Sequence, residues 1–104
     1  MMMYVSDPSG ESWSAVAVRE VRVALAAVGD ADRADAMRRY MRDQFVFFGV
    51  PTPQRRAITK QVLAPLAAPL PTDLEEIGPI AWLADERETQ YAAVDVLVRD
   101  VRLA

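Results

Sequence analysis

Apolar residues recur every three or four positions along most of the chain, which is the period of an amphipathic helix. The first such stretch begins at Ser12 and ends before Gly29, and its apolar stripe is formed by Val16, Ala17, Val21, Ala24, Leu25 and Val28. Glycine suits the end of a helix, and the following Asp30 suits the N-cap of the next one. A second helix is predicted over residues 31–44, with one semi-apolar face formed by Met37, Tyr40, Met41 and Gln44.

A short aromatic segment, residues 45–51, separates the second helix from the third. Its phenylalanines are expected to lock two helices together, and Gly49 is expected to take a turn geometry that a side chain would obstruct. The third helix is predicted to start at Thr52 and Pro53, with threonine as the N-cap and proline in the first helical position. Its apolar stripe is formed by Ile58, Val62 and Leu66.

Three prolines within residues 64–71 predict a connector. The sequence T-D-L-E at residues 72–75 matches a capping box and predicts the start of a fourth helix, which Gly78 and Pro79 are expected to kink or shorten. Trp82, near the end of this helix, is expected to lie in the core. A fifth helix is predicted to begin near Asp85, because acidic residues in a first turn are favoured by the helix dipole.

Five helical patterns without a convincing strand pattern predict an all-α protein. Helices that alternate with short turns marked by proline or glycine favour antiparallel helical hairpins, stacked side by side as HEAT-like repeats of an α-solenoid. The 104 residues are enough for one domain. We assign residues 12–104 to this helical repeat domain and residues 1–11, which carry Ser, Asp, Pro and Gly, to a flexible N-terminal arm.

The sequence contains no cysteine and no histidine. This composition excludes disulfides, Ser-His-Asp and Cys-His catalysis and the usual zinc ligands, so that no metal site and no cofactor are expected. The longest apolar runs are far shorter than the roughly 20 residues that a spanning helix needs, and no signal peptide is evident at the start. We therefore expect a cytoplasmic protein without a membrane partner.

Positive charge is concentrated in one part of an acidic chain. Seven of the 12 basic residues lie between Arg33 and Lys60, against two acidic residues, although the whole chain has a formal net charge of −3. A localised basic patch can recognise an anion while the whole protein remains acidic. This segment is therefore the main functional candidate.

The segment contains two arginine clusters, and each has its own possible explanations. Arg38, Arg39 and Arg42 gather opposite the semi-apolar face of the second helix, where a solvated surface partly paired with Asp35 is the simplest interpretation. A second cluster in the first turn of the third helix opposes the helix dipole, and it consists of Arg55 and Arg56. Such an inconsistency is typical of a functional site, but a buried salt bridge to a neighbouring carboxylate explains it equally well.

Two motifs carry a resemblance to a known family. The pattern Met37-x-x-Tyr40-Met41-x-x-Gln44-Phe45-x-Phe47-x-Gly49-Val50-x-Thr52-Pro53-x-Arg55-Arg56 resembles the opening of the AlkD-like DNA alkylation repair enzymes. The later pattern Trp82-x-x-x-x-Glu86-Arg87-Glu88-x-Gln90-x-Ala92-Ala93-x-Asp95 resembles the family's next repeat. The resemblance covers about residues 30–104 and corresponds to the N-terminal portion of these DNA glycosylases, which are built from HEAT-like repeats.

The resemblance implies hydrolysis of the N-glycosidic bond of cationic alkylated purines, with alkylated duplex DNA as the partner. It implies DNA contacts at Tyr40, Thr52, Arg55 and Arg56, and helical spacing adds Lys60. The family's catalytic Trp and Asp are expected downstream of residue 104, so that this chain has no catalytic residue and is expected to be inactive alone. Trp82 and Asp95 belong to a different, structural motif, and Pro51 stands where some relatives carry a polar residue.

Two alternatives remain. A non-catalytic helical repeat module could bind proteins, with its arginines as ordinary surface charges, whereas a small helix-turn-helix regulator is less favoured because no compact three-helix unit stands out. A truncated solenoid also leaves the apolar face of its last helix without a neighbour. We therefore expect either a homodimer through the fifth helix or a rearranged C-terminal end.

Overall fold

The structure is a computed structural model that describes the backbone of residues 11–103 and the side chains of residues 11–99. It contains five helices: α1 (Trp13–Ala27), α2 (Ala31–Tyr40), α3 (Thr52–Leu63), α4 (Pro71–Trp82) and α5 (Arg87–Leu103). Within the described residues the only β interaction is an isolated parallel bridge between Val46 and Glu86. The predicted all-α class is confirmed, whereas almost all of the expected N-terminal arm lies outside the described residues.

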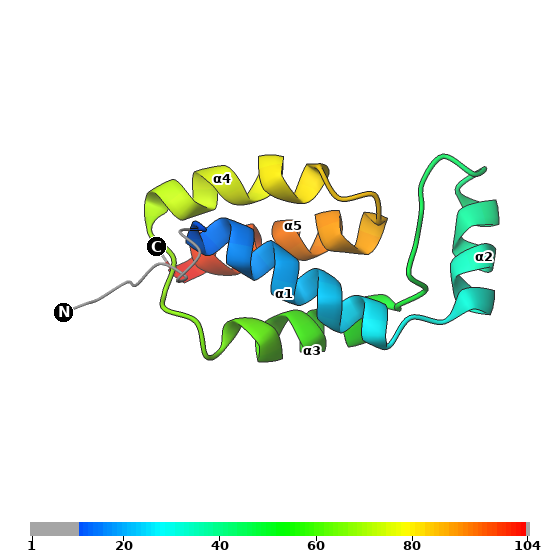
Figure 1. Ribbon diagram of the computed structural model, residues 1–104, viewed down its shortest axis with the longest axis horizontal. Helices are drawn as coiled ribbons and strands as arrows, with labels where there is room; N and C mark the ends of the chain where they lie inside the picture. The colour runs from blue at the N-terminus through cyan, green and yellow to red at the C-terminus, as the bar shows by residue number, and fades with distance from the viewer. Residues whose placement is uncertain (1–10, 104) are drawn as a thin grey trace.

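Helix α1 is the centre of the bundle. It packs against α3, α4 and α5, and Figure 1 shows α4 and α3 on opposite sides of it, with α5 behind. The predicted stripe supplies the buried Ala17, Val21 and Leu25, and these residues join side chains of α4 and α5 in one core. Helix α2 stands apart at one end of the bundle (Figure 1), and among the described residues no other helix packs against it.

The first turn of α1 is fixed by polar contacts as well as by packing. The Ser12 hydroxyl accepts a hydrogen bond from the Ala15 N–H at 3.1 Å and so caps the helix. The buried Ser14 hydroxyl donates to the Asp73 carbonyl oxygen at 2.6 Å, and the Trp13 indole N–H donates to the Ala67 carbonyl oxygen at 2.7 Å. These two long-range bonds join α1 to α4 and to the connector before it.

Three predicted boundaries were wrong by a few residues. Helix α2 ends at Tyr40 rather than at residue 44, because Arg42 and Asp43 take left-handed backbone angles with φ of 56° and 59°. Helix α3 starts at Thr52, but Pro51 occupies the N-cap, so that Thr52 is the first helical residue. Helix α5 starts at Arg87, two residues later than expected.

The fourth helix differs from its prediction in three ways. It begins at Pro71, and the Asp73 carboxylate accepts a hydrogen bond from the Leu70 N–H at 2.8 Å, so the capping residue lies two positions before the predicted Thr72. It continues through Gly78 and Pro79 to Trp82. The Trp82 side chain is 50% exposed and therefore lies outside the core where it was expected.

No helix among the described residues combines the length and the apolar character that crossing a membrane requires.

Candidate nucleic-acid interface

The segment between α2 and α3 is held in place by one buried carboxylate. Glu88, in the first turn of α5, is 2% exposed. Its oxygens accept hydrogen bonds from three consecutive backbone N–H groups, those of Phe48 at 2.9 Å, Gly49 at 2.9 Å and Val50 at 3.0 Å. Because charge-assisted bonds to a buried carboxylate are among the stronger hydrogen bonds in proteins, this contact fixes the backbone that leads into α3.

The residue two positions earlier joins α5 to α1. Glu86 receives two hydrogen bonds from the Arg22 guanidinium, from Nε at 2.7 Å and from Nη2 at 2.9 Å. These bonds hold the pKa of the Glu86 carboxyl below its ordinary value and raise the pKa of Arg22. The Glu86 carboxylate therefore keeps its charge to a lower pH than an ordinary glutamate does.

Arg87 lies between these two acids and is surrounded by aromatic rings. Its guanidinium carbon lies 4.1 Å from the ring centre of Phe45, 5.1 Å from that of Tyr91 and 5.9 Å from that of Trp82. The Arg87 N–H donates to the Val46 carbonyl oxygen at 2.8 Å. Residues 86–88, which we call the α5 clamp, therefore hold the loop of residues 45–50 through backbone and ring contacts.

The same loop also touches the start of α2. The Asp30 N–H donates to the Phe48 carbonyl oxygen at 2.9 Å. Gly49 has a φ of +90°, and a Cβ atom there would lie 2.1 Å from the Asp30 carbonyl oxygen and 2.8 Å from the Ala34 nitrogen. The predicted need for glycine in this turn is confirmed, and only glycine lets the two backbones approach this closely.

Three of the predicted DNA-contacting residues form a stripe on α3, which we call the α3 stripe: Thr52, Arg56 and Lys60. All three are exposed. Since they are spaced four residues apart, they follow one side of the helix at intervals of about 6 Å. Thr52 lies in the first turn, where backbone N–H groups are available to an anion.

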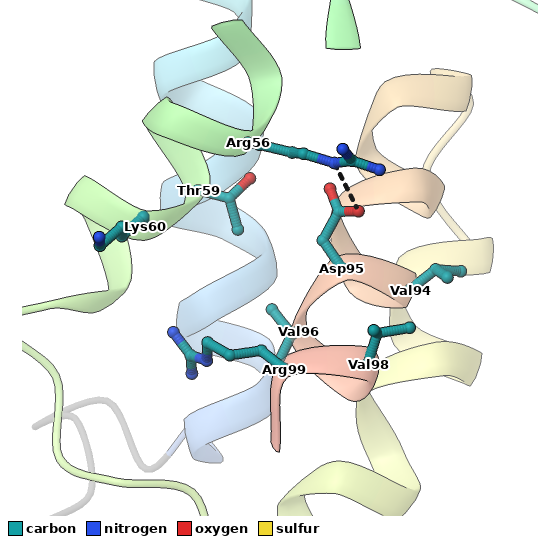
Figure 2. Close-up of a pocket in the computed structure, with 8 residues that line it drawn as sticks. All are labelled: Arg56, Thr59, Lys60, Val94, Asp95, Val96, Val98 and Arg99. Carbon is teal, nitrogen blue, oxygen red and sulfur yellow. Dashed lines mark ion pairs between the residues drawn. The ribbon is translucent and has the colours of Figure 1, made fainter. Parts of the chain in front are cut away.

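The α3 stripe borders a hollow between α3 and α5. Its volume is about 580 Å³, and Figure 2 shows Arg56 and Lys60 on its α3 side, with Asp95 and Arg99 on its α5 side. Arg56 Nε lies 3.6 Å from the Asp95 carboxylate, which is long for a hydrogen bond. The Arg56 side chain is 67% exposed, so that it can turn toward an anion in solution.

Arg55 is placed differently from its neighbour. It is 6% exposed, and its guanidinium donates to both oxygens of Asp95, from Nε at 3.0 Å and from Nη2 at 3.3 Å. It also lies 5.2 Å from the ring centre of Tyr91 and donates to the Thr52 hydroxyl at 3.4 Å. The buried salt bridge, one of the two explanations that the sequence allowed, is therefore found at Arg55. Arg55 also supports the α3 stripe through its contact with Thr52.

Tyr40 lies in a second, apolar hollow of about 340 Å³ beside α2. The ring is 86% exposed at the end of the helix. Met37, Met41 and Phe47 line the same hollow, and Tyr91 of α5 lines it from the bundle. Since Tyr91 precedes Asp95 by one helical turn, the apolar hollow and the hollow beside the α3 stripe follow each other along α5.

Three of the five predicted residues therefore line the two hollows: Arg56 and Lys60 one, and Tyr40 the other. Thr52 and Arg55 line neither, but Arg55 contacts Asp95 and Tyr91, which line one hollow each. The contributions of Glu88, Tyr91 and Arg99 were missed because each lies at least 28 positions beyond Lys60, where the basic segment ends. For Glu88 a signal was present, since the acid-arginine-acid pattern of residues 86–88 belongs to the second motif. The acidic residues were, however, interpreted only through the helix dipole.

Comparison with known proteins finds a match to one protein family. A family model for the DNA alkylation repair enzyme matches residues 21–102, which is most of the chain and includes the α3 stripe and the α5 clamp. A search of curated proteins finds no match. The chain belongs to the DNA alkylation repair enzyme family.

Proposed function

We propose that the α3 stripe binds the sugar-phosphate backbone of duplex DNA. The observation that carries this proposal is the spacing of two exposed cations and a hydroxyl along one side of α3, at the border of a hollow. Arginine, lysine and the N–H groups at a helix start are the groups that most often contact DNA phosphates. Tyr40, which is exposed beside the neighbouring hollow, contacts the same duplex from α2.

The reaction served by this binding is excision of cationic alkylated purines through hydrolysis of the N-glycosidic bond, as the family resemblance implies. An alkylated purine is already a good leaving group, so that an enzyme must chiefly stabilise the positive charge that develops on the sugar. We do not assign Asp95 to this task, because both of its oxygens accept hydrogen bonds from Arg55. In this proposal the chain supplies helices that bind the DNA backbone.

Arg55 has a supporting role in this proposal rather than a phosphate contact. Its guanidinium is almost fully buried, and it is held by Asp95, Thr52 and the Tyr91 ring. Turning it toward a phosphate would leave the Asp95 carboxylate without its strongest partner. We therefore expect Arg55 to orient the start of α3, while Arg56 and Lys60 contact the phosphates.

The test is binding of the whole chain to a duplex DNA by fluorescence anisotropy across a salt series. Each lost phosphate contact lowers the slope of log affinity against log salt by about 0.9, so Arg56→Gln/Lys60→Gln is expected to lower it by about 1.8. The matched control is Arg19→Gln/Arg22→Gln, which also removes two charges, from arginines of α1 that are ion-paired with Glu11 and Glu86. An equal effect of the two double variants would refute the proposed interface.

A second candidate function is binding of another protein, and one observation favours it. Three exposed apolar side chains lie near the turn between α4 and α5: Val46 at 52%, Trp82 at 50% and Leu83 at 85% exposure. A protein-binding module predicts no salt-dependent DNA binding, and no effect of Arg56→Gln/Lys60→Gln on binding. The same anisotropy series therefore separates the two functions.

A further inference from the structure

Helix α2 is not held in the molecule by its own core packing. None of its side chains is buried, and among the described helices none packs against it. Its start is fixed by the Asp30–Phe48 hydrogen bond and by the close approach at Gly49. Because no residue of α2 is buried, most of its surface can be reached by a partner molecule.

The charges on α2 are unevenly neutralised. Arg38 pairs with Asp35 at 3.1 Å and with Asp43 at 3.2 Å, and so takes both of the nearest carboxylates. Arg39 and Arg42 are exposed, and neither has a carboxylate within ion-pair distance in the part of the chain that the structure describes. Arg39 donates only its Nε–H within this part, to the Asp35 carbonyl oxygen at 3.3 Å. Two guanidinium groups at the C-terminal end of α2 are therefore available to an anion.

The backbone after α2 favours this distribution of charge. Arg42 and Asp43 both lie in the left-handed region, which costs a non-glycine residue about 1–3 kcal/mol. In this turn the Asp43 N–H donates to the Arg38 carbonyl oxygen at 2.8 Å, and the Asp43 carboxylate reaches the Arg38 guanidinium. The turn thus directs the acid toward Arg38, and Arg39 and Arg42 keep their charges uncompensated.

The position of α2 favours duplex DNA over other anionic partners. The first turn of α2 contacts Gly49, and Gly49 lies three residues before Thr52, where the α3 stripe starts. The start of α2 therefore lies close to the start of the α3 stripe. Near the end of α2, Tyr40 lines a hollow together with Tyr91, whose ring Arg55 contacts. We propose that Arg39 and Arg42 form a second phosphate-binding surface, which grips the same duplex from α2. This inference rests on the proposed function in one respect, since it takes DNA as the partner.

The experiment compares three double variants of the whole chain in the same salt series. Arg39→Gln/Arg42→Gln is expected to lower the slope by about 1.8, as for two lost phosphate contacts. With equal affinities at 1 M salt, this slope lowers the affinity at 0.1 M salt by about 60-fold. Arg39→Lys/Arg42→Lys keeps both charges and is expected to retain the slope. Arg19→Gln/Arg22→Gln is again the charge-matched control, since both of its arginines lie on α1 and are ion-paired.

Because arginines at a helix C-terminus also stabilise the helix, circular dichroism must show that α2 is retained in the variants. The quadruple variant that combines Arg39→Gln/Arg42→Gln with Arg56→Gln/Lys60→Gln is expected to lower the salt slope by the sum of the two separate decreases, because independent sites act additively. A slope for Arg39→Gln/Arg42→Gln equal to that of the control would overturn the inference and leave the α3 stripe untouched. A normal slope for Arg56→Gln/Lys60→Gln would instead overturn the proposed function.

Discussion

Replacing Glu88 by glutamine is the most direct test of how the interface is positioned. Glutamine has nearly the same shape, but one of its two terminal groups is an amide NH₂, which cannot accept a hydrogen bond. In the orientation that costs least, the amide oxygen keeps the bonds from Gly49 and Val50, which both reach the same carboxylate oxygen. The NH₂ group then faces the Phe48 N–H, and that donor loses its acceptor.

The expected loss of stability follows from these three bonds. One buried N–H without an acceptor costs about 1–3 kcal/mol, and replacing two charge-assisted bonds by neutral ones costs on the order of 1 kcal/mol each. Part of this is offset because burying an amide costs less than burying a carboxylate. We expect Glu88→Gln to lower the free energy of unfolding by about 2–4 kcal/mol, or the melting temperature by at least about 8 °C for a domain of this size.

The assay is urea unfolding followed by circular dichroism, combined with amide hydrogen exchange at the three donors. Exchange is local, so the N–H groups of Phe48, Gly49 and Val50 are expected to lose more protection than amides in the middle of α1. Glu76→Gln on the exposed side of α4 is the matched control and is expected to change stability by less than about 0.5 kcal/mol. A Glu88→Gln protein that resembles this control in both measurements would refute the clamp.

Three further predictions follow from other contacts. Gly49→Ala is expected to destabilise the fold by several kcal/mol, because its Cβ would lie 2.1 Å from a carbonyl oxygen at a φ of +90°. Gly78→Ala is expected to stabilise α4 by about 0.5–1 kcal/mol, because no atom lies within 4 Å of the added Cβ. Thermal melts of both variants test this pair. Because the pKa of Glu86 is lower in the folded protein, its ion pair contributes stability at a pH above the ordinary glutamate pKa of about 4.3. This contribution is lost as the pH falls through the lowered pKa of the folded protein. Arg22→Gln should flatten this acid limb of the stability curve, although only modestly because the Arg22 side chain is 47% exposed, and an unchanged limb would contradict the pairing. The expected dimer through α5 should appear in sedimentation velocity and should dissociate when the exposed Val94 is replaced by glutamate; a monomer at all concentrations would argue against it.

The number and order of the helices could be predicted from sequence because apolar periodicity and capping residues are local signals. Asp30 caps α2 as expected, since its carboxylate accepts from the Arg33 N–H at 3.0 Å. The helix boundaries that were predicted wrongly lie where more than one residue could serve as the cap. Thr72 and Leu70 each stand three residues before an acid, and the structure uses the pair Leu70 and Asp73.

The burial of individual side chains was less predictable. Trp82 was expected in the core from its hydrophobicity alone, but Ile77 and Ala81 occupy the buried side of α4 and leave the indole half exposed at the end of the helix. Its ring instead lies near Arg87, a partner on another element. A sequence pattern cannot assign such a contact, because it depends on how the turn between α4 and α5 is folded.

Arg55 and Arg56 show most clearly why the interface needed a structure. Both are adjacent arginines in the first turn of one helix, and one residue rotates a side chain by about 100° around the helix axis. That rotation places Arg55 against Asp95, which lies 40 residues further along the chain, and leaves Arg56 in solution. The sequence left two explanations open, a functional site and a buried salt bridge. The structure shows the salt bridge at Arg55, whereas phosphate binding by Arg56 stays a proposal. In an arginine pair of this kind, the exposed member is therefore the one to test for phosphate contact.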